Sequence, residues 1–194
     1  MTTRVTLISP ARSVASDEVR FDADGPLSEA GLRGVRAAAE VVTPPGPAGR
    51  VFASPSSRCA QTADGLGLRE AVAAPGAAGC AMGRWRGRTL EEVTADEPEA
   101  VGDWLSDPGR APHGGESVRD LCARVDAWLT GLAAEPGRVL AVVEPDVVRA
   151  AVVCALGAPA GSFWRVDVEP LTATDFSGRS GRWNLRPGSR LAPG

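Results

Sequence analysis

The sequence predicts a three-layer α/β/α sandwich built on a mainly parallel sheet. Apolar runs typical of buried strands alternate along the chain with segments whose apolar residues recur every three or four positions. The clearest run, residues 138–143, is of the kind found in parallel sheets that are covered on both faces. The chain has 194 residues, about the size of one domain, so we expect residues 1–194 to form a single domain.

In the first half of the chain, residues 4–9 are expected to form a short buried strand. A helix is predicted over residues 28–42, followed by a turn rich in Pro and Gly. Residues 50–53 read as a second strand. Ser54 and Pro55 come next, and they are expected to open a helix as its capping residue and its first helical residue.

The second half continues the alternation. Residues 117–134 form the clearest predicted helix, because their apolar residues share one face and Ser117 followed by Asp120 is typical of a helix start. The remaining expected elements are a short strand within 70–79, helical segments over 89–105 that restart at Pro98, a helix over 146–156 that ends at Gly157, and two strands within 163–185.

Composition excludes several classes of function. All 21 basic residues are Arg and the net charge is −3, so mechanisms that need a lysine amine are excluded. The arginines are scattered, which argues against a nucleic-acid interface. No apolar run is long enough for a membrane span and the N-terminus does not resemble a signal peptide, so we expect a cytoplasmic protein.

The cysteines and histidine are few. The spacing of Cys59, Cys80, Cys122 and Cys154 matches no zinc or redox motif, so we expect reduced thiols, no metal and no cofactor. His113 is the only histidine, and it lies on a predicted loop where a histidine is usually solvated. It is nevertheless the only imidazole that could reach an active site.

Five short motifs occur in an order typical of one family. They are DGPLSEAG at 24–31, ASPSSRCAQTA at 53–63, GRWRG at 83–87, GGES at 114–117 and EPDVVR at 144–149. Together they resemble the motifs of the histidine phosphatase superfamily, which has the phosphoglycerate mutase-like fold. Each motif alone is weak, but five in sequence over nearly the whole chain predict this fold.

The departures from the family pattern fall on the residues of its chemistry. The resemblance places Pro10 where the family has its nucleophilic His, and Ser9 where it has a phosphate-binding Arg. Glu144 takes the place of the second His, and Gly79 that of the general acid. Of the core set, only Arg58 remains. Phosphoryl transfer through histidine needs all of these functions, so we expect no phosphatase activity.

Two functions of different classes follow from these residues. The first is a degenerate family member that acts as an anion-binding or regulatory module, with Arg58, Arg12 and Ser9 as candidate anion contacts. This module would bind a phosphate ester or a carboxylate. The sequence leaves open whether it also binds a protein partner. The second is an enzyme that reuses the pocket, with Glu144 or His113 as catalytic candidates. Glu144 could be a general base, or could pair statically with an arginine; weak phosphatase activity through His113 is a third possibility.

Overall fold

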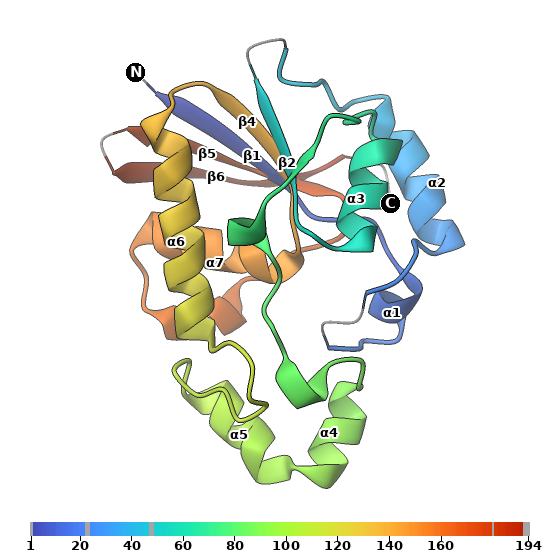
Figure 1. Ribbon diagram of the computed structural model, residues 1–194, viewed down its shortest axis with the longest axis vertical. Helices are drawn as coiled ribbons and strands as arrows, with labels where there is room; N and C mark the ends of the chain where they lie inside the picture. Colours follow the sequence, from blue (N-terminus) through green and yellow to red (C-terminus); the bar gives the residue numbers. More distant parts are fainter. Residues whose placement is uncertain (1, 22–23, 47–48, 180, 192–194) are drawn as a thin grey trace.

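A six-stranded mixed sheet forms the centre of the protein, as the computed structural model in Figure 1 shows for residues 2–21, 24–46, 49–179 and 181–191. The strand order is β3-β2-β4-β1-β5-β6. The strands are β1 (Thr3–Ile8), β2 (Arg50–Ala53), β3 (Val72–Ala73), β4 (Arg138–Val142), β5 (Thr172–Arg179) and β6 (Arg182–Arg190).

The pairing confirms a mainly parallel sheet. β1 and β2 both run parallel to β4, with Val5 beside Val139 and Val51 beside Leu140, and β2 is also parallel to β3. β5 and β6 add an antiparallel edge. The carboxyl ends of β1, β2 and β4 therefore lie at one edge of the sheet, as the sequence predicts.

Helices cover both faces of the sheet. The α-helices of the described residues are α1 (Val14–Asp17), α2 (Glu29–Ala39), α3 (Ser57–Gly65), α4 (Leu90–Asp96), α5 (Pro98–Ser106), α6 (Val118–Ala134) and α7 (Pro145–Leu156), with short 3-10 helices η1 (Pro75–Ala77), η2 (Gly83–Trp85) and η3 (Ala160–Arg165). α6 and α7 pack with Leu7 and Ala141 on one face, whereas α2 and α3 pack with Ile8 and Val142 on the other. This alternation along each strand gives the three layers.

α4 and α5 form the end of the molecule that lies farthest from the sheet (Figure 1). Thr89 caps α4, and Pro98 starts α5 as expected. The segment after α1 contacts this end of the molecule. Arg20 forms an isolated antiparallel β-bridge with Thr89, and the Phe21 amide donates to the Arg88 carbonyl at 2.9 Å. A cavity described below lies between this end and the sheet edge.

The helix after β2 starts two residues later than the sequence predicts, because Ser54 is not its cap and Pro55 is not its first residue. α3 begins at Ser57 with Ser56 as its cap, whose hydroxyl accepts from the Cys59 amide at 3.3 Å. The Ser54 hydroxyl instead donates to the Ala77 carbonyl and accepts from the Glu144 amide at 3.3 Å. These partners are distant in the sequence, so local capping preference could not reveal them.

Other boundaries also need correction. The first predicted helix ends at Ala39 rather than at residue 42, and the start of segment 163–185 is part of η3, with both strands following it. The Gly157 stop is confirmed by its left-handed φ of 60°. Within the described ranges, we find no helix with the length and hydropathy that crossing a membrane requires.

Candidate functional site

A cavity of about 380 Å³ lies at the carboxyl edge of the sheet, where α/β proteins commonly bind ligands. We call it the carboxyl-edge cavity. Its lining combines basic, acidic and aromatic side chains. The basic ones are Arg20, Arg58, Arg86 and Arg149; the acidic ones are Asp24, Glu144 and Asp146; and the aromatic ones are Phe21, Trp104, Phe163 and Trp164.

Arg58 and Glu144 form a two-pronged ion pair in this cavity. Arg58 lies in the first turn of α3 and Glu144 directly precedes α7. Arg58 Nε donates to Glu144 Oε1 at 3.0 Å, and its terminal nitrogen Nη2 donates to Oε2. Their side chains are only 19% and 9% exposed, respectively. Of the two roles considered for Glu144, the structure shows the static pair with Arg58.

Further donors surround the Glu144 carboxylate. The Ser56 hydroxyl donates to Oε1 at 2.6 Å, and Cys59 Sγ lies 3.5 Å from the same oxygen. Burial and the Glu144 charge raise the pKa of the Cys59 thiol well above its usual value. Burial opposes the charge of Arg58, but the hydrogen bond that Arg58 donates to Glu144 raises the Arg58 pKa. Arg58 thus stays charged, and Cys59 stays a neutral thiol.

Asp146 is a second carboxylate beside this pair. Its Oδ2 accepts from the Cys80 amide at 2.6 Å and its Oδ1 from the Val147 amide at 2.8 Å. Burial, together with the nearby Glu144 charge, raises the pKa of Asp146 to about 6. A carboxyl group of this pKa can gain or lose a proton near neutral pH.

Gly79 lies against both carboxylates. A Cβ atom at this position would come 3.2 Å from Glu144 Cγ and 3.5 Å from Asp146 Oδ2. The place that the family resemblance gives to a general acid is therefore bordered by two acidic side chains. A third carboxyl group there would meet both steric and charge repulsion.

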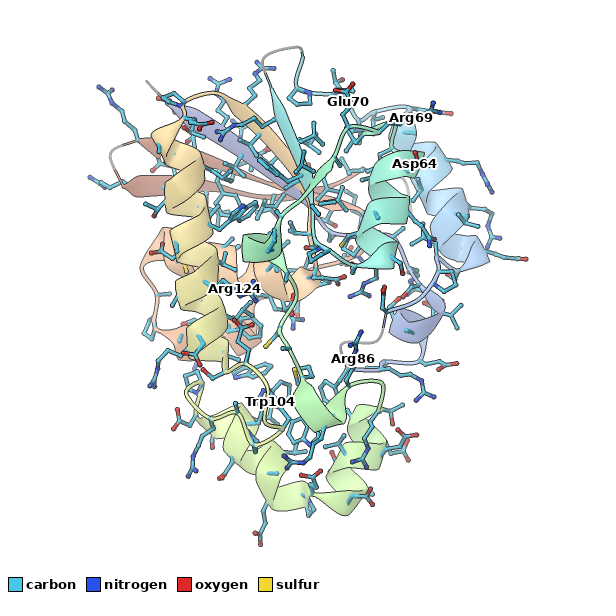
Figure 2. All side chains as sticks on the ribbon, in the orientation of Figure 1. Asp64, Arg69, Glu70, Arg86, Trp104 and Arg124 are labelled. Carbon is cyan, nitrogen blue, oxygen red and sulfur yellow. The ribbon has the colours of Figure 1, made fainter. Side chains whose placement is uncertain are left out.

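Arg124 on α6 holds the cavity wall near Gly79. Its terminal nitrogen Nη1 donates to the carbonyls of Gly76 at 3.0 Å and Ala78 at 2.9 Å, while Nη2 and Nε bind the Glu116 carboxylate. Figure 2 shows Arg124 directed from α6 toward the segment that crosses the middle of the molecule. Arg124 therefore helps to fix this wall, together with Ser54 and Asp146, which bind backbone groups of the same segment.

Arg149 and the aromatic residues form a different part of the lining. The Arg149 guanidinium carbon lies 5.7 Å from the centre of the Phe163 ring. Trp164 packs on Phe163 and Trp104, with ring centres 5.0 and 4.3 Å apart. Phe21 meets Trp104 edge-on at 5.6 Å. Trp104 and Arg86 lie toward the α4 and α5 end of the molecule in Figure 2.

The expectation that His113 is solvated is wrong. The side chain is 1% exposed and packs against Trp85, with ring centres 5.1 Å apart. Its Nδ1 accepts from the Gly115 amide at 3.0 Å, and burial and the Arg84 charge lower its pKa. His113 does not line the carboxyl-edge cavity, so the structure does not bring it to Glu144 and Arg58.

Two of the predicted anion contacts also lie outside the cavity. The Ser9 hydroxyl donates to the Glu169 carbonyl at 2.5 Å and accepts from the Thr172 amide at 3.0 Å, so it joins β1 to β5. Arg12 is exposed, and its Nε lies 3.8 Å from Asp17. Pro10 follows β1 at the same sheet edge as Glu144, since the Val143 amide donates to the Ile8 carbonyl at 2.9 Å.

Metal-binding groups are not gathered in this site. Among the residues that the structure describes, no group of three or more His, Cys, Asp or Glu side chains could hold a metal ion. All four cysteines are free thiols, three of them buried. The chemistry available in the cavity is that of arginine, carboxyl and aromatic groups.

The sheet order, the flanking helices and the cavity at the carboxyl edge define an α/β protein of the phosphoglycerate mutase-like fold. Residues 13–187 match the family model of the histidine phosphatase superfamily, branch 1. The chain belongs to the histidine phosphatase superfamily.

Mycobacterial relatives support this assignment. The chain is 30% identical over 186 residues to the bifunctional protein Rv2228c of Mycobacterium tuberculosis, an alignment that covers 90% of this chain and 50% of that protein. It thus spans about half the length of the curated relatives that it matches best in coverage. A shorter stretch of 65 residues is 38% identical to the glucosyl-3-phosphoglycerate phosphatase of the same organism, covering 34% of this chain and 29% of the relative.

Solved structures agree with the fold. A mycobacterial glucosyl-3-phosphoglycerate phosphatase in complex with VO3 superposes with a TM-score of 0.83 and 28% identity, covering 98% of this chain and all of that one. Its complex with inorganic phosphate gives a TM-score of 0.82 at 26% identity, over 97% of this chain and 98% of that one. A putative alpha-ribazole-5'-P phosphatase from Escherichia coli, 21% identical, shares the fold with a TM-score of 0.83, over 99% of this chain and 98% of that one.

Sequence reasoning did not single out Asp146 and Arg149, which line the cavity, or Arg124, which holds its wall. A signal existed for two of them, because Asp146 and Arg149 belong to the EPDVVR motif that follows β4. No comparable signal existed for Arg124. Its role depends on backbone carbonyls of the segment 76–79, whose position the sequence does not reveal.

Proposed function

We propose that this chain is a degenerate histidine phosphatase without phosphoryl-transfer activity, and that its cavity binds a small anionic ligand as a regulatory or binding module. The observation that carries the proposal is the ion pair between Glu144 and Arg58. In this pair, the Glu144 carboxylate neutralises Arg58, the one residue of the family's core set that this chain retains. A phosphate ester entering there would be repelled by Glu144 and would find Arg58 already paired.

The absence of a usable imidazole supports the same conclusion. His113 is buried against Trp85, and Pro10 has no nucleophilic atom. Nucleophilic loss in other covalent mechanisms lowers turnover by about 10⁶-fold. The preserved cavity and its arginines favour ligand binding over a purely structural role.

Hydrolysis of p-nitrophenyl phosphate tests the loss of activity. We expect no turnover above a blank for the wild type, and none for His113→Ala or Arg58→Ala prepared in the same way. Turnover by the wild type that disappears in Arg58→Ala would contradict the proposal. If it also disappears in a folded His113→Ala variant, His113 would be the nucleophile.

Asp146 supports a second candidate, an enzyme that uses the cavity for acid–base chemistry on an anionic substrate. Its pKa of about 6 suits proton transfer near neutral pH, whereas Glu144 is held by Arg58. A carbon-13 NMR titration of the aspartate carboxyl groups tests this candidate. It requires one carboxyl that titrates near pH 6 and is missing in Asp146→Asn; an ordinary titration of Asp146 excludes it.

A further inference from the structure

Each carboxylate that lines the carboxyl-edge cavity already has partners. Glu144 pairs with Arg58, and both oxygens of Asp146 accept from backbone amides. Asp24 Oδ1 accepts from the Ser57 amide at 2.9 Å and from its hydroxyl at 2.5 Å. The acidic side chains of the lining are therefore occupied within the protein itself.

Arg149 differs from two other arginines of the cavity lining, which form ion pairs with glutamates. Arg20 pairs with Glu18 at 2.5 Å, and Arg58 pairs with Glu144. Within the described part of the chain, Arg149 has no carboxylate within ion-pair distance, and its buried Nε has no acceptor. Its guanidinium carbon lies over the Phe163 ring, 5.7 Å from the ring centre. Because a guanidinium stays charged and its partial burial is unfavourable, an anion in the cavity would stabilise it.

The surface beside Arg149 is aromatic. We call Phe21, Trp104, Phe163 and Trp164 the aromatic wall; all four line the cavity and are linked by ring contacts. The indole N–H groups of Trp104 and Trp164 also lack acceptors among the described residues. The wall therefore offers apolar ring surface for an aromatic ligand and unpaired N–H donors for an acceptor group of that ligand.

We propose that the ligand of this cavity is an aromatic anion, with its carboxylate or phosphate group on Arg149 and its ring against the aromatic wall. The proposal deepens the anion-binding function proposed above and rests on it. It moves the anion contact from Arg58, which Glu144 occupies, to Arg149, which has no anionic partner in the described chain. A cavity of about 380 Å³ lies within the range of sites that hold small organic ligands.

Calorimetric titration with three probes tests the proposal: 2-naphthoate, its neutral analogue 2-naphthamide, and inorganic phosphate. The proteins are the wild type, Arg149→Gln, Arg58→Gln and the control Arg33→Gln, which removes a 65% exposed arginine of α2. Loss of a charge-assisted hydrogen bond corresponds to about 10- to 100-fold in affinity. We expect that loss of naphthoate affinity in Arg149→Gln, with little change in Arg58→Gln or Arg33→Gln.

The probes separate the parts of the ligand. Wild-type protein should bind naphthoate at least about tenfold more tightly than either naphthamide or inorganic phosphate, since only naphthoate has both the charge and the ring. In Arg149→Gln, the advantage of naphthoate over naphthamide should disappear. In NMR spectra, naphthoate should shift the indole N–H signals of Trp104 and Trp164 but not that of Trp183 on β6.

Several results would overturn the proposal. Equal naphthoate affinities in Arg149→Gln and Arg33→Gln would show that Arg149 does not bind the anion. A loss of affinity confined to Arg58→Gln would show that the anion binds Arg58 instead. Phosphate binding as tight as that of naphthoate would show that the aromatic ring of the ligand does not contribute to affinity, although the cavity does bind anions. Failure of every probe to bind would overturn the anion-binding function itself. If Arg149→Gln does not fold, two measurements replace it. They are the naphthoate affinity of Arg149→Lys and the ratio of the naphthoate and naphthamide affinities of the wild type, and they decide whether Arg149 binds the anion.

Discussion

Arg58 and Glu144 hold each other across the carboxyl ends of β2 and β4, with Arg58 Nε 3.0 Å from Glu144 Oε1. The family resemblance gives these two positions to groups that would both face a phosphoryl group. Here the two side chains neutralise each other instead. The charge that could attract a substrate is therefore used within the protein.

Glu144→Gln should weaken folding and strengthen phosphate binding. The amide keeps hydrogen-bonding capacity but leaves Arg58 without its counter-charge, so we expect a loss of roughly 2 kcal/mol, below the 3–5 kcal/mol for fully buried pairs. Inorganic phosphate should bind about tenfold more tightly than to the wild type because one repulsive charge is gone. Thermal unfolding with and without phosphate measures both effects.

Glu135→Gln is the control for this change, since Glu135 is 77% exposed and pairs with Arg50 outside the cavity. It should leave phosphate binding unchanged. Weaker phosphate binding in Glu144→Gln than in the wild type would show that Glu144 helps to hold the anion, contrary to the expectation.

Asp146→Asn should change how stability depends on pH. The folded state raises the Asp146 pKa from 3.8 to about 6, so the folded protein holds this proton more tightly than the unfolded chain. The resulting penalty on folding grows as pH rises from about 4 to about 6 and is constant above that, reaching on the order of 3 kcal/mol. Asn carries no such penalty.

Urea unfolding of both proteins at about pH 4.5 and about pH 7.5 checks this linkage. The free energy of unfolding of Asp146→Asn, relative to wild type, should be higher at the upper pH. Asp126→Asn, a change on the exposed side of α6, should show no such dependence. The same difference at both pH values would mean that Asp146 titrates normally.

Arg124→Met should loosen the wall of the cavity. It removes the donors to the carbonyls of Gly76 and Ala78 and leaves Glu116 without its partner. We expect a loss of about 3 kcal/mol, which for a protein of this size lowers Tm by roughly 10 °C. Arg119→Met on the same helix removes a 67% exposed arginine and should shift Tm little. Equal shifts in the two variants would contradict a role for Arg124 in holding the wall.

Two helical glycines should respond in opposite ways to alanine. A Cβ at Gly31 would come 2.0 Å from the Arg12 carbonyl oxygen, whereas a Cβ at Gly131 in α6 would meet nothing within 4 Å. Gly131→Ala should therefore stabilise by about 0.5–1 kcal/mol, and Gly31→Ala should destabilise by about 1–3 kcal/mol. Thermal unfolding compares them directly, and a stabilised Gly31→Ala would show that the DGPLSEAG segment can move away.

Local pattern was enough to place most elements of this fold. The strand at 138–143 and the helix capped by Ser117 follow from apolar periodicity and hydrogen bonds that close within a few residues. The start of α3 depends instead on what Ser54 binds, and its partners Ala77 and Glu144 are far away in sequence. Capping preference could not anticipate that competition.

The site was only partly predictable for the same reason. The motifs brought Arg58 and Glu144 to one sheet edge, because strand ends are easy to align. The burial of His113 depends on Trp85, and the wall held by Arg124 depends on an irregular segment. Such long-range packing leaves no periodic trace in the sequence.

The closeness of Gly79 to Glu144 also limits which single substitutions could restore the family pattern at this site. A side chain at position 79 would begin 3.2 Å from Glu144 Cγ, so an acid introduced there requires Glu144 to shift or to be replaced. Replacing Glu144 alone leaves Arg58 unpaired and still provides no nucleophile at Pro10. An acid at position 79 and the replacement of Glu144 therefore each carry a cost in packing or charge when made alone. The packing of this site couples positions 79 and 144, so the effect of a substitution at one depends on the residue at the other.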